Sequence, residues 1–150
     1  MTKERCQVVD SWYAKRNPKY GKIIKAIEGE GVCPFCPGKL KYHTNPVLRS
    51  TSEWFLTENF MPYKNAGRHF LIIGKRHQEQ FDNLIAQDFI EVRALAKWAI
   101  RKFDIRGGAL ALRFGETRFT GATVVHLHFH LIEPSVKRNG RARTVLFPIG

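Results

Sequence analysis

A run of alternating histidines constrains the fold of this chain more than any other feature. His126, His128 and His130 are separated from one another by single apolar residues. Alternate side chains of a β-strand face the same way, roughly 6.5–7 Å apart. The run therefore predicts a strand with three imidazoles on one face. The opposite, buried face is filled by Val125, Leu127, Phe129 and Leu131.

Three imidazoles on one face predict chemistry rather than simple contact with solvent. Threonine, serine, lysine or glutamate would serve a solvated strand, whereas histidine titrates near neutrality, binds metals and acts as a nucleophile or acid–base group. Three of the six histidines of the chain lie within these five residues. We therefore expect a catalytic or ligand-binding site on this strand.

Helix and strand patterns alternate along the rest of the chain. Helices are predicted at residues 19–31 and 86–108, and glycines end both patterns. In the longer helix, apolar residues recur at helical spacing: Phe89, Val92, Ala96, Ala99 and Phe103. Runs rich in aromatic and β-branched residues predict strands at 53–60, 68–77, 109–114, 123–132 and 143–149. This pattern favours one α+β domain with an antiparallel sheet and a long covering helix.

Length and hydropathy place the chain in the class of small globular proteins. Its 150 residues, 43% of them hydrophobic, suffice for one domain with a core. No apolar run approaches the roughly 18 residues that a membrane span needs, and the N-terminus lacks the apolar centre of a signal peptide. We expect a cytoplasmic protein with no membrane partner.

Positive charge is concentrated in two terminal stretches. The net charge is +12, and the first 25 residues carry seven lysines and arginines against Glu4 and Asp10. The tail after Glu133 has no acidic residue and contains Lys137, Arg138, Arg141 and Arg143. This balance favours polyanionic ligands such as nucleotides, phosphates or nucleic acid. A solvated basic surface is the alternative, because no aromatic residues interleave with these charges.

Cys33 and Cys36, in the segment CPFC, have the spacing of two ligands of a tetrahedral zinc site. Three cysteines do not make a disulfide framework, and Cys6 is given no role. A redox role would require a thioredoxin-like βαβ context, which the pattern lacks, and an iron–sulfur cluster would require four cysteines.

Taken together, four segments resemble the histidine triad (HIT) superfamily of nucleotide hydrolases and transferases. HLHFHLI matches the family pattern His-φ-His-φ-His-φ-φ, where φ is apolar, and CPFC resembles the zinc knuckle of many members. NFMPYKNAGRHFLIIGKRH resembles the segment Asn-x-x-Pro…Gly-His-x-x-φ-φ-Pro-Lys-x-His, and GATVVH resembles Gly-Gln-Ser-φ-x-His. The resemblance covers roughly residues 33–134.

The resemblance implies a fold and an assembly. We expect residues 1–150 to form a single HIT-like domain: a five-stranded antiparallel sheet with a long and a shorter helix packed on one face. Its core would span about residues 33–134, between a basic N-terminal extension, 1–32, and a basic tail, 135–150. Members of the family usually pair as homodimers.

The resemblance also implies a reaction. His128 would attack the α-phosphorus of a nucleotide and form a covalent nucleotidyl-histidine, and His130 would contact the phosphate or protonate the leaving group. Thr123 would supply its hydroxyl and backbone N–H to the phosphate. Asn59 would approach the nucleoside, with capping of its turn as the alternative. No organic cofactor is implied.

Two departures from the family pattern affect phosphate binding. The family glutamine before Thr123 is Ala122 here, and the upstream phosphate-contacting asparagine has no clear match. The loop RFGETRFTG is two residues longer than usual and offers Arg113 or Arg118 instead. We favour Arg113, because its planar guanidinium would contact phosphate oxygens bidentately.

In zinc-bearing members of the superfamily, two histidines complete the structural site of the cysteine pair. The matching residues here are His77 and His126. His43 and His69 remain alternative ligands.

Other readings of the same residues stay open. In one alternative, the protein is a metalloenzyme whose three strand histidines all bind one catalytic metal. In the other, it is a basic module stabilised by zinc that binds nucleotide or nucleic acid without catalysis. The family acts on dinucleoside polyphosphates, nucleoside phosphoramidates, sugar nucleotides and adenylylated ends of nucleic acid. A third histidine at His130 favours the hydrolases over the transferases.

Overall fold

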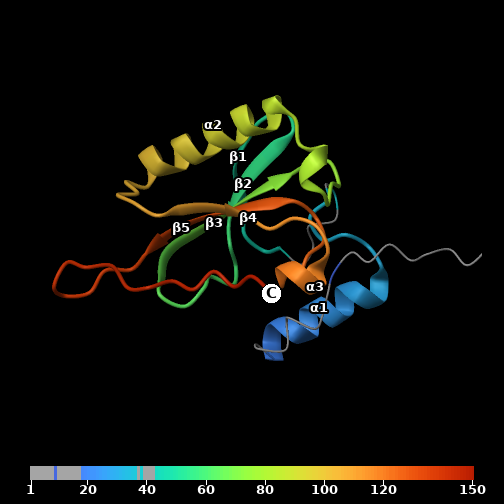
Figure 1. Ribbon diagram of the computed structural model, residues 1–150, viewed down its shortest axis with the longest axis horizontal. Helices are drawn as coiled ribbons and strands as arrows, with labels where there is room; N and C mark the ends of the chain where they lie inside the picture. The colour runs from blue at the N-terminus through green and yellow to red at the C-terminus, as the bar shows by residue number, and fades with distance from the viewer. Residues whose placement is uncertain (1–8, 10–17, 37, 39–42) are drawn as a thin grey trace, which may run out of the picture.

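A computed structural model describes Val9, residues 18–36, Gly38 and residues 43–150. Cys6 and most of the basic N-terminal stretch lie outside the described residues. In chain order the elements are α1 (Pro18–Glu30), β1 (Val47–Ser50), β2 (Trp54–Glu58), β3 (Ala66–Gly74), the short 3-10 helix η3 (Phe81–Asn83), α2 (Ala86–Lys102), β4 (Ala109–Leu112), α3 (Thr117–Thr120) and β5 (His128–Pro134) (Figure 1). No helix of these ranges is both long and apolar enough to cross a membrane.

The strands form one five-stranded sheet in the order β1-β2-β3-β5-β4, and all neighbours are antiparallel. This confirms the predicted sheet, but the prediction of a strand at 143–149 is wrong. The fifth strand is β1, a largely exposed edge strand whose sole partner among the described strands is β2. An edge strand has little apolar content to reveal it. Within 143–149, Phe147 instead covers the ring of His130.

Both faces of the sheet are covered. Alternate residues of β3 and β5, such as Ile72 and Phe129, pack against α2. The residues between them, such as Leu71, pack in a second cluster with Ile24 and Ile27 of α1. Figure 1 shows α2 on one side of the sheet and α1 and α3 on the other. The prediction of helices on one face is therefore wrong, because a strand that is buried on both faces needs cover on both. The core also includes α1, which precedes Cys33.

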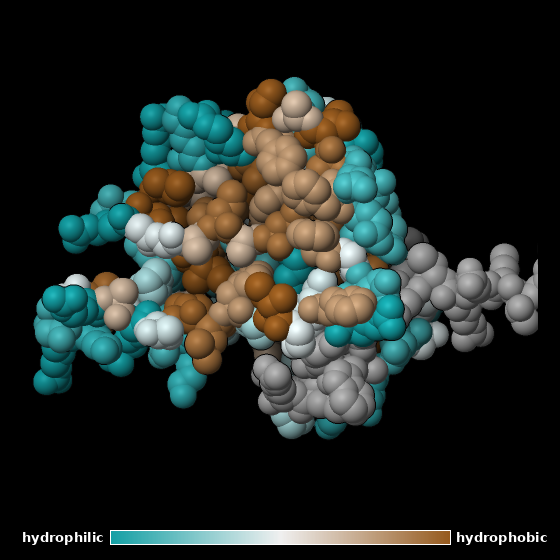
Figure 2. Space-filling model, in the orientation of Figure 1, coloured by the Kyte–Doolittle hydropathy of each residue, from teal (hydrophilic) through white to brown (hydrophobic). Residues whose placement is uncertain are grey.

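Apolar side chains gather on the surface near the start of α2 and beside β4, as Figure 2 shows. The exposed members are Phe81, Ile85, Phe89, Leu110 and Phe114. Phe81 contacts both Phe89 and Phe114, with ring centroids 6.2 and 5.3 Å apart. Phe89, one of the apolar residues that recur at helical spacing, belongs to this exposed surface, which we call the β4 patch.

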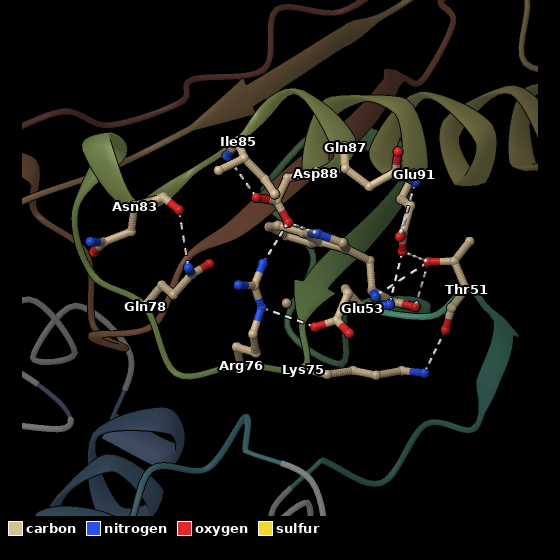
Figure 3. Close-up of polar contacts among 12 residues, drawn as sticks. Thr51, Glu53, Lys75, Arg76, Gln78, Asn83, Ile85, Gln87, Asp88 and Glu91 are labelled. Atoms are coloured by element: carbon tan, nitrogen blue, oxygen red, sulfur yellow. Dashed lines mark hydrogen bonds and ion pairs between the residues drawn. The ribbon is translucent and has the colours of Figure 1, made fainter.

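Two buried carboxylates of α2 attach this helix to the sheet (Figure 3). Asp88 accepts hydrogen bonds from the indole N–H of Trp54 at 2.8 Å and from the backbone N–H of Ile85 at 2.8 Å, which caps the helix. Glu91 accepts from the Thr51 hydroxyl at 2.6 Å, and this bond in particular lowers the pKa of its carboxyl group. Arg76, two residues after the end of β3, also binds Asp88. This ion pair fixes Arg76 and, with it, the position of the next residue, His77.

Gly108 lies at a close approach between strands. A Cβ atom at this position would lie 2.0 Å from the carbonyl oxygen of Ile132 in β5. The predicted helix ends at Lys102 rather than at the glycines. Gly108 therefore serves the pairing of β4 with β5 and not the end of the helix.

Candidate active site

The triad straddles the start of β5. His128 pairs with Ile73 and His130 with Leu71 in the register of β3 and β5, and their ring centroids lie 4.9 Å apart. His126 precedes the strand, and its Nε2 donates to the carbonyl oxygen of Gly74 at the end of β3. The observed strand therefore begins at His128, five residues after the predicted start at residue 123. The first histidine is consequently separated in role from the other two.

His128 has a defined tautomer. Its Nδ1 lies 2.7 Å from the carbonyl oxygen of His126. A carbonyl oxygen only accepts hydrogen bonds, so Nδ1 carries the hydrogen and Nε2 keeps its lone pair. Burial lowers the pKa of His128 to about 4, which keeps the ring neutral near pH 7. The result is a neutral imidazole with a nucleophilic nitrogen.

His130 is held by a chain of directional hydrogen bonds. The backbone N–H of Tyr63 donates to Nδ1 of His69 at 3.2 Å, so neutral His69 carries its hydrogen on Nε2. That Nε2–H donates to Nδ1 of His130 at 2.9 Å. Burial is the main cause of the low pKa values of both rings, so both are neutral near pH 7. Neutral His130 therefore presents Nε2–H as a donor.

Arg113 lies beside that donor. Its Nη1 is 3.4 Å from Nε2 of His130, its Nε donates to the carbonyl oxygen of Pro148 at 2.7 Å, and its Nη2 donates to the Tyr63 hydroxyl at 3.0 Å. Since both Nη1 and Nε2 of His130 carry hydrogen, they do not bond to each other. An anionic oxygen between them would accept from both. Arg118, by contrast, is exposed and pairs with Glu116 at 2.6 Å.

A cavity of about 890 Å³ opens beside these groups. His128, His130, Arg113, Asn59 and Thr123 all line it. Its other walls are largely apolar and include Ile23, Ile24 and Ile27 of α1 with Phe35, Phe60 and Leu71. The structure thus brings the predicted nucleophile and every predicted phosphate- or nucleoside-contacting residue to one cavity.

Two of these residues also have local partners. The Thr123 hydroxyl lies 2.7 Å from the hydroxyl of Tyr20 on α1. Asn59 accepts from the backbone N–H of Met61 at 3.0 Å, which is the capping alternative, while it lines the cavity at the same time. The two interpretations of Asn59 are therefore compatible.

Cys33, Cys36, His77 and His126 form a second cluster, and their ligand atoms all lie within 4.8 Å of one another. Sγ of Cys33 is 3.3 Å from Nδ1 of His126, and Sγ of Cys36 is 3.6 Å from Nδ1 of His77. Ligands of a tetrahedral Zn²⁺ lie about 3.3–3.8 Å apart, as the metal–ligand lengths require. The donor set and its spacing fit this metal.

The two histidines of the cluster provide an independent test of that fit. Nε2 of His126 donates to Gly74 and Nε2 of His77 faces the Glu79 carboxylate at 2.9 Å, so both hydrogens are on Nε2. The two Nδ1 atoms then face each other at 3.2 Å with lone pairs and no hydrogen between them. A cation bound by both would remove this repulsion.

The alternative metal ligands lie elsewhere. Nε2 of His43 is 2.7 Å from the Thr57 hydroxyl, and His69 binds His130. The sequence indicated His69 only as an alternative metal ligand, whereas in the structure this residue orients His130. The signal was available in the alternation along β3, which places His69 on the same face as Leu71, the partner of His130. Contacts of Tyr63 and Phe147 with the His130 ring had no comparable signal.

The loop before the triad contains α3. Gly121 ends this short helix with a φ of +69°, and a Cβ atom there would lie 2.9 Å from the carbonyl oxygen of Gly150. Residues 144–150 therefore pass close to α3 and to Arg113, and the exposed Leu146 and the partly buried Phe147 line the cavity.

On a five-stranded antiparallel sheet, His128 presents a nucleophilic nitrogen and His130 an N–H donor to one cavity. This arrangement defines a class of α+β proteins with a histidine triad. The HIT domain model matches residues 62–136, which are 75 of the 150 residues. The chain belongs to the HIT family.

Solved structures share this fold. A HIT family hydrolase from Clostridium thermocellum is 24% identical with a TM-score of 0.54, over 66% of this chain and 86% of that one. A HIT family protein from Bacillus anthracis is 22% identical with a TM-score of 0.53, over 75% and 77%. A diadenosine triphosphate hydrolase from Plasmodium falciparum is 21% identical with a TM-score of 0.50, over 64% and 65%. No curated protein matches the chain.

Proposed function

We propose that this protein is a nucleotidyl hydrolase or transferase. It would cleave a nucleoside phosphate ester, anhydride or phosphoramidate at the α-phosphate through a covalent nucleotidyl-histidine. The observation that carries the proposal is the hydrogen bond from Nδ1 of His128 to the carbonyl oxygen of His126, because it leaves Nε2 of a neutral ring as nucleophile beside the cavity.

The reaction has two balanced steps. Nε2 of His128 attacks the α-phosphorus and forms an N–P bond, while the bond from phosphorus to the leaving group breaks; the leaving group departs with the bonding electrons and takes any proton it needs from solvent. Nε2–H of His130 donates a hydrogen bond to a phosphate oxygen in both steps. Water then attacks the same phosphorus and releases one proton to solvent, and the N–P bond breaks with its electrons returning to Nε2 of His128, which frees the nucleoside monophosphate. Arg113 donates to the phosphate oxygens in both steps.

Quenching in alkaline denaturant provides the test of the covalent step. The protein is incubated with adenylylated and guanylylated compounds: dinucleoside polyphosphates, phosphoramidates, sugar nucleotides and adenylylated nucleic-acid ends. With the best substrate, quenching under single-turnover conditions is expected to trap one nucleotide per chain. The label should be labile to acid and stable to base, as a phosphoramidate is. Absence of label while substrate is consumed would indicate direct attack by water.

Arg113→Ala is expected to lower kcat/KM about 10²-fold, because one charge-assisted donor to the phosphate is lost in the transition state. Arg113→Lys should recover only part of the lost kcat/KM, since an ammonium group lacks the planar pair of donors of a guanidinium. Arg118→Ala is the matched control and should leave the rate unchanged, because Arg118 is exposed and paired with Glu116. Equal rates for Arg113→Ala and the unmodified protein would exclude a role for Arg113.

We infer that two copies of the chain pair through the β4 patch. Among the described strands, β4 pairs only with β5, so its outer edge is available, and Leu110 on it is 46% exposed. Sedimentation equilibrium should give the mass of a dimer, and Leu110→Glu should give a monomer. Val47→Glu, on the opposite edge strand, is the control and should remain dimeric. A monomeric mass for the unmodified protein would contradict the inference.

We also propose that Cys33, Cys36, His77 and His126 hold one structural Zn²⁺, which would cross-link the segment before β1 to β3 and β5.

The basic residues of the tail, Lys137, Arg138, Arg141 and Arg143, are exposed, and nucleic acid as a partner stays a prediction.

A further inference from the structure

Tyr20 is a residue of α1 that neither the proposed reaction nor the proposed zinc site uses. The helix spans Pro18–Glu30 and lies outside residues 62–136, which the HIT domain model matches. In Figure 1 it lies on the same side of the sheet as α3. Tyr20 lines the cavity that His128 also lines, and its ring centroid lies 5.9 Å from that of Phe60. A helix beyond the matched segment therefore adds a phenol to the wall of the cavity.

The same helix holds the segment that carries Thr123. Residues 121–127, between α3 and β5, belong to no strand, so contacts with other elements set their conformation. Val124 is buried in one cluster with Ile24 and Ile27 of α1. The position of Thr123, the residue before Val124, therefore depends on α1.

One hydrogen bond joins Tyr20 directly to Thr123, with their hydroxyl oxygens 2.7 Å apart. Burial raises the pKa of Tyr20, against the opposing effects of the Thr123 hydroxyl and the positive charge of Arg113, so the phenol keeps its hydrogen near pH 7. A phenol is a stronger acid than an aliphatic alcohol and a weaker acceptor, because its ring withdraws the oxygen lone pair. Tyr20 is therefore the donor, and the Thr123 oxygen accepts.

That donation leaves the hydrogen of the Thr123 hydroxyl for another acceptor. A hydroxyl carries one hydrogen, and within the described part of the chain the structure gives this hydroxyl no partner other than Tyr20. Thr123 lines the cavity, as do Arg113 and Ala122, the preceding residue, which has no polar side chain. Because hydrogen bonds in a chain polarise one another, donation by Tyr20 makes the Thr123 hydroxyl a stronger donor. Its hydrogen is therefore available to an oxygen atom of a molecule in the cavity.

We propose that Tyr20 is a positioning residue for phosphate binding: its hydroxyl orients that of Thr123, which then donates to an oxygen of the reacting phosphate. This rests on the proposed function and adds to it a residue that lies outside the segment matched by the HIT domain model. A donor that is already oriented needs no reorganisation when negative charge develops on the phosphate, so it contributes most in the transition state. Without the Tyr20 hydroxyl, rotation of the Thr123 hydroxyl would be unrestrained.

A double-mutant cycle tests this, with the substrate that the unmodified protein turns over fastest. Tyr20→Phe keeps the ring and removes the hydroxyl, and it is expected to lower kcat/KM about tenfold, the effect of one hydrogen bond. Thr123→Val removes the hydroxyl that Tyr20 orients and should lower kcat/KM at least as far. Adding Tyr20→Phe to Thr123→Val should change kcat/KM by less than about twofold, because the two residues act through one hydroxyl.

Two further variants serve as controls. Thr123→Ser keeps a hydroxyl, so Tyr20→Phe should again lower kcat/KM about tenfold in this background. Lys22→Ala removes an exposed side chain of α1 that lies outside the cavity, and it should leave kcat/KM unchanged, both alone and together with Thr123→Val. Thermal melts establish that each variant is folded at the assay temperature.

The outcomes separate the two proposals. A kcat/KM for Tyr20→Phe within about twofold of the unmodified protein overturns the role of Tyr20. Independent losses that multiply in the double variant also overturn it, because Tyr20 would then act through the shape of the cavity and not through Thr123. Both results leave nucleotidyl transfer intact. Absence of turnover by the unmodified protein on every compound of the panel would overturn the proposed function and the role of Tyr20 with it.

Discussion

Replacing His128 with asparagine is expected to lower turnover by about three powers of ten or more, since loss of a nucleophile removes the covalent route entirely. Asparagine cannot place a nucleophilic nitrogen where Nε2 lies. The melting temperature and metal content should stay close to those of the unmodified protein, because His128 is half-buried and is not in the cysteine cluster. Steady-state rates, thermal melts and metal analysis on one preparation measure all three.

His128→Gly makes the same prediction sharper. It leaves a space beside Phe35, whose ring centroid lies 5.0 Å from that of His128. Added imidazole should enter that space and restore part of the rate. Retention of more than about a tenth of the rate in His128→Asn would refute covalent catalysis.

The sequence was sufficient for the site residues whose position depends on local periodicity. Alternation in β5 placed His128 and His130 on one face, and the strand register then set them beside Leu71 and Ile73. The family resemblance added His77 and His126, which no periodicity connects. Since His128 and His130 lie on β5, their direction follows from the pleat, whereas His77 and His126 lie outside the strands.

The remaining features depend on contacts between distant segments. The bond between His43 and Thr57, the donation from Tyr63 to His69, and the cover that Phe147 gives to His130 each join a loop to the sheet. Loop conformation is set by side-chain partners elsewhere in the chain, so no local pattern reveals it. The edge strand β1 was missed for the related reason that its exposed residues carry no apolar alternation.

Loss of the metal cluster is expected to have the largest effect on stability. Cys36→Ser should lower the melting temperature by about 10 °C or more and remove about one zinc per chain, because a structural zinc site contributes directly to folding. The cluster joins segments that are far apart: 41 residues separate Cys36 from His77, and 93 separate Cys33 from His126. Cys6→Ser is the matched control and should change neither quantity, since Cys6 is given no ligand role.

Mutations in the metal cluster should then affect mainly stability, and mutation of His128 should affect mainly activity. In Cys36→Ser, turnover should fall only as far as β5 is loosened, because His126 precedes His128 by two residues and its carbonyl oxygen holds the His128 ring. In His128→Asn, zinc and melting temperature should be kept while turnover is lost. Zinc that is lost with His128 but kept with Cys36→Ser would mean that the triad itself binds a catalytic metal. In that case the Nε2 lone pair of His128 would be a metal ligand, and covalent nucleotidyl transfer would have to be abandoned.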